Sequence, residues 1–376
     1  MMARLEEICA INMGQSPDSS TYNEDGNGLP FFQGNADFGE IYPAVRMWCS
    51  EPTKIAREKD ILISVRAPIG ALNIANCECC IGRGLAALTV NEDICAQEYL
   101  WHALSGKVDE LNSKGTGSTF KAINKKTLSE TEIPLPPIDE QRKIAAILDK
   151  VSDLIAKRHQ QLDKLDEMVK ARFVEMFGDV IQNTKLWPQY IFSDITTSRL
   201  GKMLDAKQQT GMCQYPYLAN FNVQWFRFEL DNLNEMDFNE ADRIEFELCD
   251  GDLLVCEGGE IGRCAVWHNE IQPCYFQKAL HRVRCKKEIV LPDYLAWWFK
   301  YNCDNRGFAA IEGAKATISH LPGAKLKALL VSVPPIEQQK QFATFVEQTE
   351  KTKNTISRSL EKLEILKKAL MQEYFG

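Results

Sequence analysis

Residues Pro136–Gly178 read PPIDEQRKIAAILDKVSDLIAKRHQQLDKLDEMVKARFVEMFG, and Pro334–Gly376 repeat the pattern as PPIEQQKQFATFVEQTEKTKNTISRSLEKLEILKKALMQEYFG. The two stretches align over 43 residues without a gap, at a constant offset of 198. Identical positions include the Pro-Pro pair, one glutamine (Gln141 and Gln339) and the closing Phe-Gly. A gapless match of this length indicates an internal duplication.

Each copy predicts one long helix. Neither contains Gly or Pro between the opening prolines and the closing glycine, and Asp139, Glu140 and Glu337 fall in the first turns, where acidic groups favour the helix dipole. Apolar residues recur every three or four positions as one narrow stripe, which is typical of a helix packed along another helix. Each helix would be roughly 55–60 Å long, so it needs a partner of similar length. The other copy is that partner, although the 154 residues between the copies allow either relative direction.

The segments outside the helices, 1–135 and 180–333, also resemble each other, more faintly. Asp60–Val65 matches Asp252–Cys256, and Glu98–Leu100 matches Asp293–Leu295, with short insertions between the blocks. Buried strands are predicted at 61–65, 85–90, 253–256 and 280–283, and short helices at 97–104 and 292–301. The fold class is therefore α+β, and the chain divides into 1–135, 136–179, 180–333 and 334–376.

Composition restricts the function classes. The 376 residues are 45% hydrophobic and 26% charged, without an apolar run long enough to span a membrane. The 13 irregularly spaced cysteines indicate reduced thiols, and hence a cytoplasmic location. The net charge is −8 overall, −6 in 1–135 (12 basic, 18 acidic residues) and −2 in 180–333 (17 and 19). This balance disfavours unspecific binding to nucleic acid, so a DNA-binding face would require a local concentration of cations.

Catalytic and metal motifs are lacking in the sequence. It contains no P-loop, no G-x-G-x-x-G after a strand and no box of the kind that amino-methyltransferases use. Cys77 and Cys80 have C-x-x-C spacing, but a zinc site usually needs a second ligand pair, and buried thiols are the simpler interpretation. We therefore expect no catalytic residue, no metal and no cofactor in this chain.

The duplicated pattern resembles the specificity (S) subunit of type I restriction-modification systems over the full chain. The resemblance is carried by "PLPPIDEQRKIAAIL" and "VPPIEQQKQF" at the helix starts, by "DILISVRAPIG" and "CIGRGLAAL", and by the "GSTFKAI" loop. It implies two target-recognition domains, each reading one half of a bipartite site in double-stranded DNA. It also implies that the helices pack antiparallel as a coiled-coil spacer with pseudo-two-fold symmetry. The second half departs from the pattern, with "GAKATIS" and "CYFQKAL" in the matching places.

The same resemblance implies the partners. Two methyltransferase (M) subunits would dock on the helices, and restriction/translocase (R) subunits would join them. S-adenosylmethionine, ATP and Mg would belong to those subunits and not to this chain.

Candidate site residues follow from residue type and position. For DNA they are the loop residues Gly117, Ser118, Thr119 and Lys121, their counterparts Lys315 and Thr317, the strand-end residues Arg66 and Arg83, and the alternating Arg282 and Arg284. For a protein partner they are Arg158, Lys170, Arg172, Phe173, Phe177 and Phe375. Each has an ordinary alternative, namely a solvent loop, a surface ion pair or a solvated helix face.

Three functions therefore stay open. The leading hypothesis is a non-catalytic DNA-specificity subunit. The second is a protein-interaction scaffold, in which the helices merely space two α+β modules. The third is an enzyme with an unrecognised site, which methyl transfer by the isolated chain would reveal. DNA sequence preference of the assembled complex separates the first from the second.

Overall fold

The computed structural model describes residues 1–117, 121–205, 209–309 and 320–376. The chain divides into two compact units, each with its own core. Unit 1 comprises residues 1–161 and 356–376, and unit 2 comprises residues 162–355. Both units therefore contain part of each long helix, α5 (Ile138–Phe177) and α11 (Ile336–Phe375).

Unit 1 contains two main sheets. The first has the order β2-β10-β7-β8, with antiparallel neighbours, and the second has the order β3-β5-β4-β9-β6, in which β4 and β9 are parallel. A separate pair joins β1 to β11, directly before α5. The elements outside the long helices are β1 (Met2–Arg4), α1 (Leu5–Ile8), β2 (Cys9–Met13), β3 (Tyr22–Asn23), β4 (Leu29–Phe32), β5 (Trp48–Cys49), β6 (Ile55–Ala56), β7 (Ile61–Ser64), β8 (Leu72–Ile74), β9 (Cys79–Ile81), β10 (Leu85–Val90), α2 (Gln97–Ser105), α3 (Val108–Ser113), α4 (Lys125–Ser129) and β11 (Glu132–Pro134), with short 3-10 turns at Ser19–Thr21 and Asn35–Asp37.

Unit 2 repeats the order of the first sheet and the strand pair before the long helix, whereas its second sheet is smaller. Its first sheet has the order β13-β21-β18-β19, its second the order β17-β14-β20 with β14 and β20 parallel, and β12 pairs with β22 before α11. The elements outside the long helices are β12 (Gln189–Ile191), α6 (Phe192–Ile195), β13 (Thr196–Leu200), β14 (Gln214–Leu218), β15 (Val223–Gln224), β16 (Arg227–Phe228), β17 (Asn234–Asp237), α7 (Glu240–Phe246), β18 (Leu253–Cys256), β19 (Cys264–Val266), β20 (Tyr275–Phe276), β21 (Leu280–Cys285), α8 (Pro292–Asp304), α10 (Gly323–Lys327) and β22 (Leu330–Ser332), with a 3-10 turn at Asn220–Asn222. The predicted α+β class is confirmed, and the shared order of the first sheet, together with the parallel pair in each second sheet, indicates that the two globular segments are copies of one fold.

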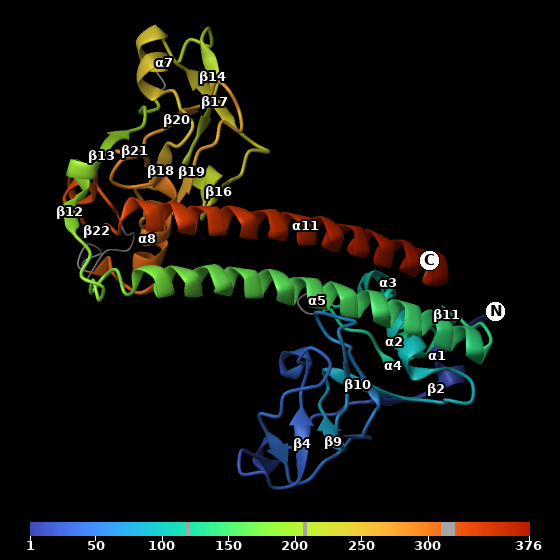
Figure 1. Cartoon of the computed structure of the whole chain (residues 1–376). Helices are drawn as coiled ribbons and strands as arrows, with labels where there is room; N and C mark the ends of the chain where they lie inside the picture. Colours follow the sequence, from blue (N-terminus) through green and yellow to red (C-terminus); the bar gives the residue numbers. More distant parts are fainter. Residues whose placement is uncertain (118–120, 206–208, 310–319) are drawn as a thin grey trace. The chain divides into compact units, whose positions relative to one another are not determined.

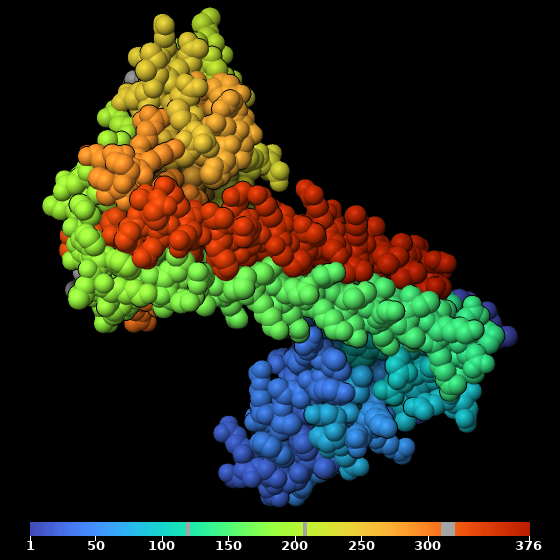
Figure 2. Space-filling view, viewed as in Figure 1, coloured from blue at the N-terminus to red at the C-terminus, as the bar shows by residue number. Residues whose placement is uncertain are grey.

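The long helices begin and end where the sequence predicts. Each begins two residues after the start of its Pro-Pro pair, and α5 ends at Phe177, directly before Gly178, whose positive φ of 72° is the conformation expected of a glycine C-cap. Within unit 2 the helices run antiparallel, because Asp166 contacts Lys353 at 2.7 Å while Phe173, further along α5, packs on Phe342, which precedes Lys353 in α11. Figure 1 shows the two helices side by side along this segment, and the space-filling view in Figure 2 shows their atoms in contact. Among the described residues, no helix has the length and apolarity needed to cross a membrane.

One glutamine fastens each long helix to its globular segment. Gln141 is fully buried; its Nε2 donates to the carbonyls of Ile94 and Pro136, and its Oε1 accepts from the N–H of Ala96 at 2.9 Å. In unit 2 the Nε2 of Gln339 likewise donates to the carbonyls of Ile289 and Pro334, and its Oε1 accepts from the N–H of Leu291. These paired arrangements explain why the duplicated motif keeps a glutamine at a buried position, where a polar group must be hydrogen-bonded. We call each of them a glutamine latch.

The carboxylate of Asp237 organises a loop of unit 2. It accepts hydrogen bonds from the backbone of Thr210, Gly211 and Cys213 and from the hydroxyl of Thr210. Burial alone would raise the pKa of Asp237, but these hydrogen bonds outweigh it and hold the pKa below the ordinary 3.8.

Asp237→Asn should therefore destabilise unit 2 in a pH-dependent way. A depressed folded-state pKa gives stability that is fully present above the unfolded pKa and is lost as pH falls through the lower folded value. We expect the stability difference between wild type and variant to be constant above about pH 5 and to shrink at lower pH in urea titrations. Asp231→Asn, at an exposed position, is the control. A difference that stays constant down to pH 2 would contradict the assignment.

Candidate nucleic-acid interface

Arg66 and Arg83 lie at the same end of the first sheet of unit 1. Arg66 follows the end of β7, Arg83 precedes the start of β10, and these strands pair antiparallel with Ser64 opposite Leu85. The N–H of Val65 donates to the carbonyl of Gly84 at 2.9 Å, which extends the pairing toward both arginines. Both side chains are exposed, so two cations project together from this edge.

Glycines on either side allow Arg83 to take this position. A Cβ at Gly82 would lie 2.9 Å from the Cα of Gln33, and one at Gly84 would lie 2.5 Å from the Gln33 carbonyl oxygen. The chain therefore passes too close to the end of β4 for larger residues. This packing is the physical reason for the G-R-G sequence.

Lys121 joins the same edge. The N–H of Ala67 donates to the carbonyl of Lys121 at 3.1 Å, and Arg66 forms a β-bridge with Ala122. Thr116 and Ala122 exchange two backbone hydrogen bonds and close the loop between them, in which Gly117 has a φ of 127°. Backbone pairing thus places Arg66, Arg83, Gly117 and Lys121 at one edge, and their role as DNA contacts stays a prediction. Ser118, Thr119, Lys315 and Thr317 lie outside the described residues.

Unit 2 presents a different set at the matching edge. The bridge between Arg66 and Ala122 is replaced by one between Gly258 and His320, and Lys278 takes the place of Arg83 two residues before β21. Lys278 and His320 are both exposed. Sequence reasoning missed them, although aligning Leu85 with Leu280 places Lys278 opposite Arg83. We call these two edges the cationic edges of units 1 and 2.

Arg282 and Arg284 point from β21 toward the end of α7. Arg284 forms a two-bond ion pair with the buried Asp252 at 2.7 and 3.1 Å, and this partner raises its pKa. Arg282 donates from Nη1 to the carbonyls of Glu245 and Glu247, and burial lowers its pKa. Both arginines therefore have partners within the chain, and their role as DNA contacts stays a prediction.

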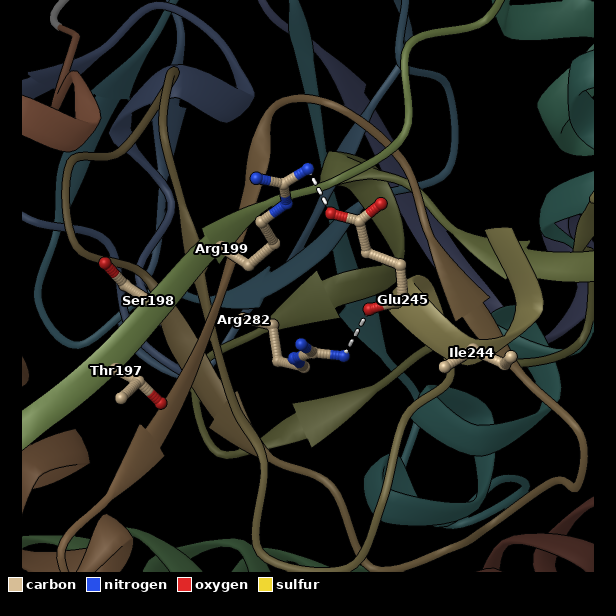
Figure 3. Close-up of a pocket in the computed structure, with 6 residues that line it drawn as sticks. All are labelled: Thr197, Ser198, Arg199, Ile244, Glu245 and Arg282. Atoms are coloured by element: carbon tan, nitrogen blue, oxygen red, sulfur yellow. Dashed lines mark hydrogen bonds and ion pairs between the residues drawn. The ribbon is translucent and has the colours of Figure 1, made fainter. Parts of the chain in front are cut away.

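A cavity of about 230 Å³ opens beside Arg282 (Figure 3). It lies between β13, β21 and α7, and Thr197, Ser198, Arg199, Ile244 and Glu245 line it together with Arg282. Arg199 forms an ion pair with the carboxylate of Glu245 and stacks over Phe246 at 5.8 Å. Arg199 is a second candidate that sequence reasoning missed, since nothing in its local sequence marks it.

The predicted partner-binding residues separate into two groups. Arg158, Lys170 and Arg172 lie on helix surfaces; Arg158 bonds Gln161, Arg172 bonds Glu175, and Lys170 lines a shallow cavity of about 220 Å³ with Trp297 and Tyr301. Phe173, Phe177 and Phe375 are buried. The prediction that these three contact a partner chain is wrong, because their rings pack inside the units: Phe173 and Phe177 against Tyr294 and Phe342, and Phe375 against Tyr99.

Metal ligands are not gathered anywhere in the described ranges, where no group of three or more His, Cys, Asp or Glu residues could hold an ion. Cys79 and Cys80 are buried with raised pKa values caused mainly by burial, Cys79 to about 12. Such thiols stay protonated and behave as small apolar side chains.

Comparison with known proteins shows that both halves of the chain match the same protein family. The model described as "Type I restriction modification DNA specificity domain" matches residues 1–167 and again residues 185–365. The putative type I restriction enzyme MjaX specificity subunit of Methanocaldococcus jannaschii is 43% identical over 165 residues, which cover 44% of this chain and 39% of that protein. The type I restriction enzyme EcoBI specificity subunit of Escherichia coli is 21% identical over 380 residues, covering 92% of this chain and 78% of that protein.

One solved structure supports the fold over the full chain. The S subunit of a type I restriction-modification system from M. genitalium covers 100% of this chain and 96% of its own, with a TM-score of 0.62 at 12% identity. The HsdS subunit from Thermoanaerobacter tengcongensis is 52% identical over 42% of this chain and 38% of its own, with a TM-score of 0.39. Since the family's domain covers both halves, this chain belongs to the type I restriction-modification DNA specificity family and carries its domain twice.

Proposed function

We propose that this chain is the sequence-reading subunit of a type I restriction-modification complex. Each globular segment reads one half of a bipartite site in double-stranded DNA, and the chain itself performs no catalysis. The observation that carries the proposal is the doubled family domain, in which the first sheet has the same strand order in both copies and a cation, Arg83 or Lys278, lies two residues before the matching strand. Arginine and lysine side chains at such edges suit phosphate oxygens and guanine edges.

The long helices are the proposed spacer and docking surface. Each has 40 residues and would set the distance between the half-sites. Two M subunits would bind the helix faces that carry Arg158, Lys170 and Arg172, and R subunits would join for cleavage. S-adenosylmethionine, ATP and Mg would act on those subunits. Because neither half is basic overall, strong DNA binding would require the assembled complex.

Exchange of residues 1–142 for those of a relative tests the proposal, because this junction keeps Gln141 together with its own loop at 94–96. In the complex assembled with M subunits, we expect one half of the methylated sequence to change while the other half and the gap stay the same. Sequencing of methylated genomic DNA provides the measurement. A change in both halves, or in neither, would contradict the assignment, and a complex without sequence preference at moderate salt would favour the protein scaffold.

Arg66→Gln tests the cationic edge of unit 1. If Arg66 contacts a phosphate, its loss should weaken duplex binding by the assembled complex and reduce the slope of log K against log salt by about 1. Lys59→Gln is a matched control, because Lys59 is exposed at the opposite end of the same strand. Equal salt slopes for wild type, Arg66→Gln and Lys59→Gln would show that Arg66 does not contact a DNA phosphate.

A further inference from the structure

The first sheet of unit 2 places two arginines directly opposite each other. Arg199 on β13 pairs with Arg282 on β21, so both side chains leave the same face of the sheet. Like charges in directly opposed positions destabilise a strand pair. The arrangement therefore requires a negative group beside the two guanidinium groups.

The end of α7 neutralises the pair only in part. The Glu245 carboxylate forms an ion pair with Arg199, and Arg282 donates to the carbonyls of Glu245 and Glu247 at 2.9 and 3.0 Å. A carbonyl oxygen carries only a partial charge. Within the described ranges, no carboxylate forms an ion pair with Arg282. The walls of the cavity thus contain two full positive charges and one full negative charge (Figure 3).

The cavity is accessible and has room for a small anion. Its volume is about 230 Å³, and the Arg199 and Glu245 side chains are 55% and 43% exposed. Thr197 lies two residues before Arg199, on the same face of β13, and adds a hydroxyl donor. Guanidinium groups bind phosphate oxygens by charge-assisted and often bidentate hydrogen bonds, which are stronger than neutral ones.

We propose that this cavity binds a phosphate group. The Arg199 guanidinium then exchanges its ion pair with the Glu245 carboxylate for one with the phosphate, and Arg282 supplies the second positive charge. Glu245 then acts as a resident competitor, since its carboxylate presents the same pair of acceptor oxygens. The phosphate group could belong to a DNA backbone or to a free phosphate ester. The inference goes beyond the proposed function, because it requires neither a partner subunit nor a base sequence.

Calorimetric titration of the full-length chain with inorganic phosphate, at constant ionic strength in chloride, tests this site. We expect saturable binding to one site. Arg199→Gln should weaken it about tenfold, and Glu245→Gln should strengthen it about tenfold, because loss of the competitor leaves both arginines available. Arg227 and Glu229 form an exposed ion pair in the same unit, so Arg227→Gln and Glu229→Gln are matched controls that should change nothing. Circular dichroism confirms that each variant is folded.

Two outcomes would overturn the inference: no saturable phosphate binding by wild type and Glu245→Gln, or equal changes in the controls.

A second experiment measures duplex binding by the complex assembled with M subunits. If Glu245→Gln raises duplex affinity and phosphate competes, the ligand is the DNA backbone; phosphate binding with unchanged duplex affinity identifies a free ester. The two proposals can fail separately. If the complex shows no DNA sequence preference but the wild-type chain still binds phosphate, the proposed function is wrong and the phosphate site is supported.

Discussion

Phe173→Ala should lower the free energy of unfolding of unit 2 by about 3–5 kcal/mol, which is the range for removing a buried aromatic side chain. Phe173 lies within ring-contact distance of Phe177, Tyr294, Trp297 and Phe342, with centroid separations of 5.1 to 6.3 Å. Its loss would leave a cavity between α5, α8 and α11 that the neighbouring rings cannot fill without moving. Urea denaturation followed by tryptophan fluorescence measures the effect, because five of the seven tryptophans lie in unit 2.

Met168→Ala provides the comparison for this experiment. Met168 lies on the same helix but is 43% exposed, so its truncation removes little buried surface. We expect a change of about 0.5 kcal/mol or less for this variant. Comparable losses for both substitutions would mean that Phe173 does not anchor the helix to the globular segment.

Gln339→Leu should cost about 3 kcal/mol in unit 2, since it removes the side-chain partner of three backbone groups, one buried and two partly buried. These are the N–H of Leu291 and the carbonyls of Ile289 and Pro334, which the glutamine latch now satisfies. Leucine fills much of the space but cannot hydrogen-bond. Urea denaturation with fluorescence detection again provides the measurement.

Two further variants make the latch prediction specific. Gln348→Leu, at an exposed position of the same helix, should leave stability within about 0.5 kcal/mol of wild type. Gln141→Leu should reproduce the loss in unit 1, where Ala96, Ile94 and Pro136 would lose their partner. A tolerated Gln339→Leu would show that water or a backbone shift satisfies the three groups.

The sequence was sufficient to predict the long helices, because caps and periodicity are local signals. Pro-Pro and Gly178 define the helix ends to within two residues. The four strands predicted from short apolar runs are all present, since continuous burial leaves a continuous apolar sequence. Sheet order could not be predicted, because it depends on pairings between strands such as β2 and β10, which are more than 70 residues apart.

The candidate DNA-binding residues show the same difference between local sequence signals and long-range pairing. Arg66, Arg83 and Lys121 were recognisable because strand ends and a glycine-rich loop mark them in the sequence. Lys278 is found only by aligning the two halves of the chain, and His320 reaches the matching edge through its bridge with Gly258. The phenylalanines at the helix ends were misinterpreted for a related reason: a stripe of apolar residues does not distinguish a face that meets another chain from one that meets its own globular segment.

The glutamine latch also limits how hybrid proteins can be assembled from this family. Its two sides are far apart in sequence, with the backbone of 94–96 on one side and Gln141 on the other. A graft joined anywhere between them would combine a donor loop with a recipient glutamine and inherit any mismatch in their spacing. Junctions placed beyond residue 141 transfer the fastening intact, so such chimaeras should retain native solubility and thermal tolerance.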